Sequence, residues 1–173
     1  MQLRVAHYNF RFTGHMYLPH IVILEARNQT KLADLLYQSV AQVLEVKGIG
    51  FSRVTIPTVL ELPTAFRIII EATKGDGANK SGDWRRPDGY VVLGSFIKSD
   101  MPYNQIAYGE VLRALQDLSC YYTLPVGFGM IVAENLENTF NYADLGRGAA
   151  QTCLALIELK SQFGLQPNAI LAP

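Results

Sequence analysis

The stretch His20-Ile21-Val22-Ile23-Leu24-Glu25-Ala26 decides how this chain folds. It is short, rich in β-branched residues and almost continuously apolar, which is typical of a strand covered on both faces in a parallel sheet. Polar residues follow, and apolar residues then recur at helical spacing from Leu32 to Leu44, until Gly48 and Gly50 end the pattern. The pattern predicts a strand followed by a helix.

The same alternation continues along the chain. Further strands are expected at 51–56, 90–97 and 124–133, and further helices near 62–70, 106–118, 135–142 and 148–163. Residues 74–88 carry three glycines and paired arginines, so a solvated loop is expected there. Strands that alternate with helices predict an α/β fold with a four-stranded parallel sheet, helices on both faces and right-handed crossovers.

Residues 1–19 do not join this alternation. Tyr8, Phe10 and Phe12 are spaced by Asn9 and Arg11, as in a half-exposed strand. We therefore expect an N-terminal arm strand within residues 1–19 and a single domain over residues 20–173. The arm could cover an edge of its own sheet or extend the sheet of a neighbouring subunit.

Composition excludes several classes of protein. The chain has 173 residues, of which 49% are hydrophobic, and this suits one globular domain rather than a disordered chain. Fifteen basic residues balance fifteen acidic ones, so neither nucleic acid nor an anionic membrane is an expected partner. Cys120 and Cys153 lack disulfide or zinc-site spacing and are expected to be buried in a cytoplasmic protein.

The functional site is expected in the loops that follow the strands, because parallel sheets bind ligands beyond their carboxyl ends. No phosphate-binding glycine loop of the P-loop or dinucleotide type, nucleophile elbow or helix with paired His and Glu at metal-ligand spacing occurs in the sequence. Polar residues of these loops are Arg27, Asn28, Gln29, Thr58, Glu61, Lys98, Ser99, Asp100, Tyr103, Glu134 and Asn135.

Each of these residues also has a structural interpretation. Glu61 could accept hydrogen bonds from a ligand hydroxyl, or could be an acid that the helix dipole favours in a first turn. The segment from Lys98 to Asp100 could bind an anion, or could be a solvated loop. Tyr103 could move a proton or pack. Phe128, between Gly127 and Gly129, is expected to be a core aromatic whose flanking glycines relieve close packing.

Seven ordered motifs point to a known family. They are Val22-Ile23-Leu24-Glu25-Ala26-Arg27, Ile56-Pro57-Thr58-Val59-Leu60-Glu61-Leu62-Pro63, Pro87-Asp88-Gly89-Tyr90-Val91-Val92-Leu93-Gly94, Tyr108-Gly109-Glu110, Pro125-Val126-Gly127-Phe128-Gly129, Glu134-Asn135-Leu136-Glu137 and Gly146-Arg147-Gly148-Ala149-Ala150. Their order and spacing resemble those of the lumazine synthases from residue 20 to residue 163.

The resemblance implies a flavodoxin-like three-layer sandwich that assembles into homopentamers, in some members into icosahedral shells. It implies a transferase of riboflavin biosynthesis that condenses 5-amino-6-ribitylaminouracil with dihydroxybutanone phosphate to dimethyl-ribityllumazine, without a metal or organic cofactor. Catalysis would come chiefly from holding two reactants together, with side chains moving protons.

The resemblance also assigns roles to single residues. Asn28 stands where the family has a stacking aromatic residue, and Val59 and Leu60 precede the ribityl-binding Glu61. Phe96 and Phe128 are assigned to the substrate pocket, with Phe128 coming from the adjacent subunit. Phosphate binding is assigned to Lys98, Ser99, Asp100 and Arg147, and Tyr103 occupies the position of the family's proton-transferring histidine.

Because residues such as Asn28 and Tyr103 differ from those of the family, three hypotheses about function are open. The first is a divergent but working lumazine synthase. The second is a non-catalytic homologue that assembles a pentamer or shell, or binds a flavin-like ligand. The third is an unrelated flavodoxin-like nucleotide-binding or signalling domain.

Overall fold

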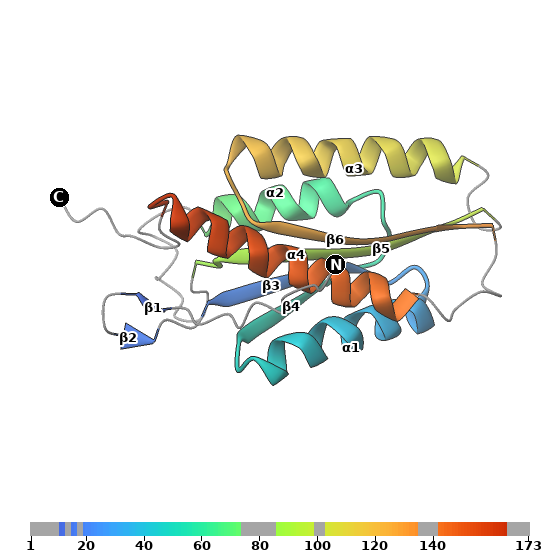
Figure 1. Cartoon of the computed structure of the whole chain (residues 1–173). Coiled ribbons are helices and arrows are strands. Elements are labelled where there is room, and N and C mark those ends of the chain that lie inside the picture. Colours follow the sequence, from blue (N-terminus) through green and yellow to red (C-terminus); the bar gives the residue numbers. More distant parts are fainter. Residues whose placement is uncertain are drawn as a thin grey trace, which may run out of the picture.

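The computed structural model describes residues 11–12, 15–16, 19–73, 86–98, 103–134 and 142–165. The strands are β1 (Arg11–Phe12), β2 (His15–Met16), β3 (His20–Ala26), β4 (Gly50–Ile56), β5 (Gly89–Ile97) and β6 (Val126–Ala133). The helices are α1 (Thr30–Val46), α2 (Leu62–Ala72), α3 (Asn104–Tyr121) and α4 (Tyr142–Gln162). Figure 1 shows their arrangement.

Four of the strands form one parallel sheet in the order β4-β3-β5-β6. The first of these strands along the chain, β3, lies between β4 and β5, so the strand order reverses beside it. All four strands end at the same edge of the sheet (Figure 1). This is the flavodoxin-like order, in which ligand sites form where the order reverses. Strands β1 and β2 pair with each other in a separate antiparallel ribbon.

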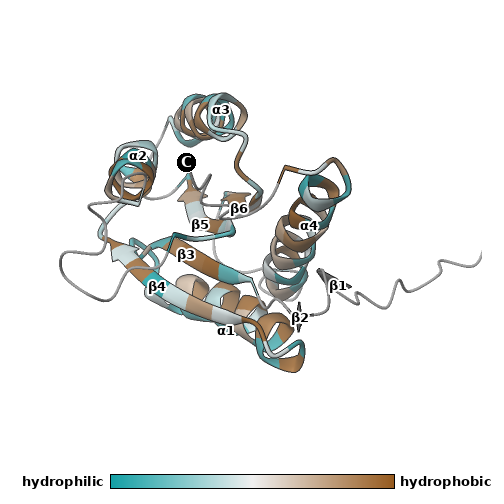
Figure 2. Cartoon of the chain, turned by 90° about the vertical axis from the view of Figure 1, so that its left-hand side faces the viewer, coloured by the Kyte–Doolittle hydropathy of each residue, from teal (hydrophilic) through white to brown (hydrophobic). Residues whose placement is uncertain are grey.

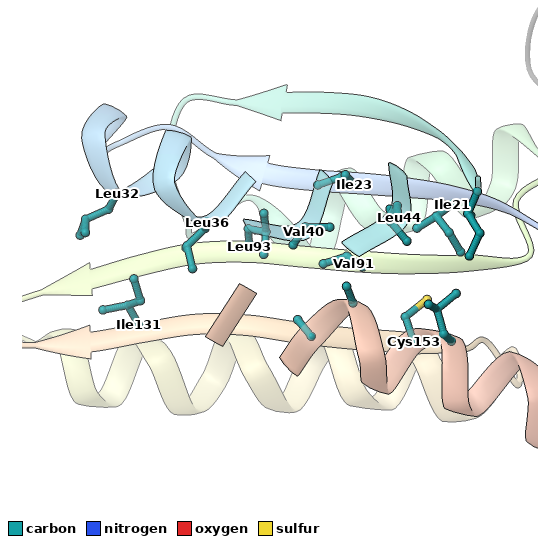
Figure 3. Packing of buried hydrophobic residues seen from close by; sticks show 14 of the residues in the cluster. Ile21, Ile23, Leu32, Leu36, Val40, Leu44, Val91, Leu93, Ile131 and Cys153 are labelled. Atoms are coloured by element: carbon teal, nitrogen blue, oxygen red, sulfur yellow. The ribbon is translucent and has the colours of Figure 1, made fainter. Parts of the chain in front are cut away.

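One face of the sheet packs against α1 and α4. Alternate residues of β3, Ile21 and Ile23, point to this face together with Val91 and Leu93 of β5. They meet apolar side chains of both helices, among them the fully buried Val40 of α1 (Figure 3). The helical spacing that begins at Leu32 thus supplies the α1 side of the core on this face of the sheet.

The other face packs against α2 and α3. Val22 and Leu24 of β3 lie there with Phe66 of α2 and Leu115 of α3, all without exposed surface. Figure 2, which looks along the strands, shows the sheet between the two pairs of helices. The expected three-layer α/β sandwich is confirmed. Because both faces are covered, β3 reads as a continuous apolar run rather than an alternating one.

Glycines permit close approach of α4 to the structure beneath it. A Cβ atom at Gly127 of β6 would lie 1.9 Å from the Ala149 carbonyl oxygen of α4. A Cβ at Gly146 would lie 2.0 Å from Ser39 Oγ of α1. The glycine next to Phe128 therefore relieves close packing, as the sequence predicts.

The structure corrects three expectations. Pro87 and Asp88, assigned to a solvated loop, are buried, and the Asp88 carboxylate accepts a 2.7 Å hydrogen bond from the backbone N–H of His20. Cys120 is exposed, because it lies at the end of α3, whereas Cys153 is buried under the sheet. The helix expected from Gly148 begins at Tyr142.

Other expectations concern residues outside the described ranges. Residues 135–141 of the expected helix at 135–142, residues 74–85 of the expected loop and most of the arm belong to this group. Within the described ranges, no helix is long and apolar enough to cross a bilayer.

Candidate functional site

The loop after β3 is fastened to both neighbouring strands. The backbone N–H of Arg27 donates to the Ile56 carbonyl at the end of β4 over 2.9 Å. On the other side, Asn28 Nδ2 donates to the Ser95 carbonyl of β5 over 3.0 Å. Asn28 thus spans the point where the strand order reverses. Its buried Oδ1 has no hydrogen-bond partner among the described residues.

A cluster of four charged side chains, Glu25, Arg27, Asp34 and Arg53, lies beside this loop. Glu25, fully buried at the end of β3, accepts hydrogen bonds at Oε1 from Arg27 over 2.8 Å and from Arg53 over 2.6 Å. The same two guanidinium groups pair with Asp34 of α1. The Arg53 guanidinium also lies 3.8 Å from the centre of the Tyr37 ring. The cluster therefore joins β3, β4 and α1 immediately before Asn28.

The electrostatics of this cluster favour the charged forms. The hydrogen bond from Arg27 lowers the pKa of the Asp34 carboxyl, and the bonds to Asp34 and Glu25 raise the pKa of Arg27. Burial of a carboxylate is costly unless it is paired, and here two cations offset that cost. Glu25 Oε2 is buried and has no hydrogen-bond partner in the described part of the chain.

The loop between β4 and α2 carries the second group of site residues. Thr58 donates its hydroxyl hydrogen to the Glu61 carboxylate, and both side chains are exposed. Leu60 is also exposed, whereas Val59 is fully buried. A Cβ at Gly94 of β5 would lie 3.0 Å from Val59 Cγ1, so this valine packs closely on the strand. Any contact of Val59 with a ligand would have to be made by its backbone.

The ends of β5 and β6 are tied together. Lys98 donates from its backbone N–H to the Ala133 carbonyl over 2.9 Å, and its Nζ lies 2.9 Å from Glu134 Oε1. The buried Asn104, at the start of α3, donates to the Phe96 carbonyl over 3.2 Å. Tyr103, the residue before it, is exposed. Ser99 and Asp100 lie outside the described residues.

The two phenylalanines of the predicted site differ in exposure. Phe96 is fully buried and packs edge to face on Tyr108 with ring centres 5.5 Å apart, so in the isolated chain its side chain is a core residue. Phe128 is only partly buried and lies on β6, an edge strand. The exposed part of this ring is available to a second molecule.

Arg147 lies on a helix rather than in one of the loops that follow the strands. It belongs to α4, which covers the opposite face of the sheet from α3, and it pairs with Asp144 one turn earlier on the same helix. Lys98 pairs with Glu134. Both cations assigned to phosphate binding therefore already contact a carboxylate.

Sequence reasoning missed three residues of this region. Arg53 completes the charged cluster, and Ser95 holds Asn28. Asn104 donates to the Phe96 carbonyl of β5 and to the Ala133 carbonyl of β6, and so anchors α3 on both strands. An available signal was Glu25, a single acid inside an otherwise apolar strand, since a buried carboxylate requires a cation nearby. The partners of Asn28 and Asn104 are backbone carbonyls, which leave no mark in a sequence.

The sheet order β4-β3-β5-β6 defines a doubly wound, flavodoxin-like α/β protein, a class of fold whose ligand sites lie at the switch point. The family model described as 6,7-dimethyl-8-ribityllumazine synthase matches residues 19–161. The chain belongs to this family.

Curated relatives agree with this assignment. The chain is 33% identical over 151 residues to the 6,7-dimethyl-8-ribityllumazine synthase of Agrobacterium fabrum, covering 84% of this chain and 97% of that one. It is 34% identical over 152 residues to 6,7-dimethyl-8-ribityllumazine synthase 1 of Rhizobium meliloti, covering 85% and 95%. For synthase 1 of Mesorhizobium japonicum the identity is 33% over 150 residues, covering 84% and 87%.

Proposed function

We propose that this chain is a lumazine synthase of riboflavin biosynthesis, condensing 5-amino-6-ribitylaminouracil with dihydroxybutanone phosphate to dimethyl-ribityllumazine with loss of phosphate. The observation that carries the proposal is the exposed Glu61 carboxylate at the carboxyl edge of the sheet, next to the reversal of strand order. A carboxylate held there by the Thr58 hydroxyl keeps further lone pairs for the hydroxyl groups of a ribityl chain.

We assign the other residues roles around this anchor. Asn28 and Phe128 face the pyrimidine ring, Phe128 being supplied by a neighbouring subunit, and the backbone at Val59 and Leu60 lines the ribityl chain. Lys98, with Ser99, Asp100 and Arg147, holds the phosphate. Tyr103 moves protons. Phe96 contributes by supporting the end of β5 from the core. Holding two reactants in place supplies several kcal/mol of the barrier reduction.

One observation favours a second candidate, a non-catalytic homologue that binds a flavin-like ligand or builds a shell. Lys98 pairs with Glu134 and Arg147 with Asp144, so binding of phosphate requires both cations to exchange a carboxylate for the phosphate. Asn28 also cannot stack on a ring as an aromatic side chain does. The active site is divergent on either proposal.

We also propose that the domain at residues 20–173 functions as a cytoplasmic homopentamer, or a multiple of pentamers. Large apolar side chains on the outer surfaces of α2 and α3 support association, notably Ile68 and Ile106, which are 62% and 73% exposed. Exposed apolar groups of this size are common at interfaces between subunits.

The proposed activity is tested by mixing purified protein with both substrates and following lumazine fluorescence against a protein-free control. We expect an excess rate, and we expect Glu61→Gln to lower it by about tenfold because a charged acceptor is lost. Glu110→Gln, a surface change on α3, is the matched control. No excess rate from a pentamer that binds the pyrimidine substrate would establish the non-catalytic candidate instead.

The phosphate side has its own test. If Lys98 binds phosphate, inhibition by inorganic phosphate should weaken in Lys98→Gln and strengthen in Glu134→Gln, which removes the competing carboxylate. Equal inhibition in both variants and in the wild type would exclude Lys98 from the site.

A further inference from the structure

An open cavity lies at the opposite edge of the sheet from the candidate active site, and Leu159, Phe163 and Leu165 of its lining are partly exposed to solvent. It is formed by the end of α3, the turn into β6 and the end of α4, and its volume is about 530 Å³. Its apolar wall consists of Leu124, Pro125, Leu156, Leu159, Phe163 and Leu165. The eight residues of β6, at about 3.3 Å each, separate it from the carboxyl-edge loops, so it is a distinct site.

A single ammonium group lines this apolar cavity. Lys160 Nζ donates a 2.7 Å hydrogen bond to the Thr123 carbonyl, which uses one of its three N–H donors. Ser119 and Thr123 also line the cavity, and the Ser119 hydroxyl donates to the Leu124 carbonyl over 3.0 Å. Burial lowers the pKa of Lys160, while Arg86 and Asp88 act on it with opposite signs. The ammonium has therefore lost part of its hydration, and no carboxylate of the described residues forms an ion pair with it.

We propose that this cavity binds a small amphiphile with an aliphatic body and a carboxylate, the body lying on the apolar wall and the carboxylate pairing with the Lys160 ammonium. The volume falls in the range of about 300–1,000 Å³ that is usual for small-molecule sites. An apolar pocket with one well-placed charge selects a ligand with one opposite charge.

The chain contains a reporter for this site. Cys120 is exposed and lines the cavity, whereas Cys153, the other cysteine of the chain, is buried. Burial raises the pKa of the Cys153 thiol to about 12, so this thiol is protonated and shielded at neutral pH. Alkylation of the folded protein should therefore occur at Cys120, and a bound ligand should slow it.

The experiment uses decanoate as the probe and decanol as its uncharged counterpart. Iodoacetamide labelling of Cys120 is followed by peptide mass spectrometry, and binding is measured by calorimetry. We expect saturating decanoate to slow labelling by about tenfold or more, and decanol to need about tenfold higher concentration for the same effect. Labelling of Cys153 in the folded protein should stay negligible.

Variants separate the contributions of the charge and the apolar wall. Lys160→Met should raise the dissociation constant for decanoate by about tenfold without changing that for decanol, and Lys160→Arg should restore binding. Arg113→Met, which removes a charge from exposed α3 surface, is the matched control. Leu159→Asp, at a half-exposed position that tolerates a polar side chain, should abolish binding of both probes.

Three results would overturn the proposal. One is unprotected Cys120 labelling at saturating decanoate. Another is equal affinity for decanoate and decanol in the wild type. The third is labelling that is slow without any ligand and becomes fast only when dilution dissociates an oligomer, because a second copy of the chain then occupies the cavity. Thermal melts of each variant confirm that a loss of binding is not a loss of fold.

Discussion

Asn28 Nδ2 and the Ser95 carbonyl oxygen lie 3.0 Å apart, and this hydrogen bond closes the sheet beyond the last backbone pair between β3 and β5. The bond fixes the orientation of the Asn28 amide, because the opposite orientation would place two oxygens against each other. The same bond ties the loop after β3 to β5, although the Asn28 side chain is too small to pack there as an aromatic ring would.

Replacement of this amide should therefore be costly. Asn28→Asp places a carboxylate against the Ser95 carbonyl, and we expect the free energy of unfolding to fall by about 1–3 kcal/mol. Urea denaturation at pH 7 measures the change. Gln38→Glu makes the same chemical change on exposed α1 surface and should be nearly neutral. Equal effects of the two variants would show that the Asn28 bond does not stabilise the fold.

The contact between β6 and α4 predicts a large effect from one methyl group. Gly127→Ala would put a Cβ 1.9 Å from the Ala149 carbonyl oxygen, so α4 must move, and we expect a loss of about 3 kcal/mol. Gly148→Ala has open space around its Cβ on the same helix and should stabilise the protein by about 0.5–1 kcal/mol. Thermal melting of both variants tests the contrast, and a mild effect at Gly127 would contradict it.

The charged cluster predicts a pH dependence. Folding lowers the pKa of Asp34 from its ordinary 3.8, chiefly through the hydrogen bond from Arg27. The resulting stabilisation is present above pH 3.8 and is lost as the pH falls through the lower folded value. The difference in unfolding free energy between wild type and Asp34→Asn should thus be level at neutral pH and shrink under strongly acidic conditions.

Urea denaturation across a pH series measures this difference. Asp117→Asn, at an exposed carboxyl on α3, reports what removal of a surface acid does by itself. If the wild type and Asp34→Asn differ by the same amount at every pH, the cluster does not hold the carboxylate.

The position of Tyr103 predicts a gain of function. An imidazole titrates near neutral pH, with an ordinary pKa of about 6.5, and so transfers protons better than a phenol. If the chain is a working synthase, Tyr103→His should raise the rate of lumazine formation by about tenfold or more. Tyr121→His makes the same change at the far, exposed end of α3 and should leave the rate unchanged. A Tyr103→His rate at or below the wild-type value would remove this residue from the proton path.

The fold could be predicted from local hydrophobic patterns in the sequence, because these patterns reflect which residues are buried. The apolar run from His20 to Ala26 predicts a strand covered on both faces, and β3 has these bounds. The start of α3 was less predictable: the pattern placed it at Ile106, but the helix begins at Asn104, whose amide binds the Phe96 carbonyl. A side chain that binds a distant backbone group leaves no periodic signal.

The site was predictable only in outline. Sheet topology correctly gathers the loops after β3, β4, β5 and β6 at one edge, since that follows from parallel strands alone. The sequence could not predict which charged side chains of the site form ion pairs with one another. The pairing of Lys98 with Glu134, and of Arg53 with Glu25, depends on residues that become neighbours only through strand register.

The central place of β3 has a consequence for biosynthesis on the ribosome. Of the four strands of the parallel sheet, β3 is synthesised first and can pair with β4 as soon as α1 and β4 follow it. Its other edge must wait until β5, which begins at Gly89, has been synthesised. During that interval a flat, apolar strand edge is open to strands of other nascent chains. We therefore expect slower translation between β4 and β5 to increase the share of this protein that aggregates.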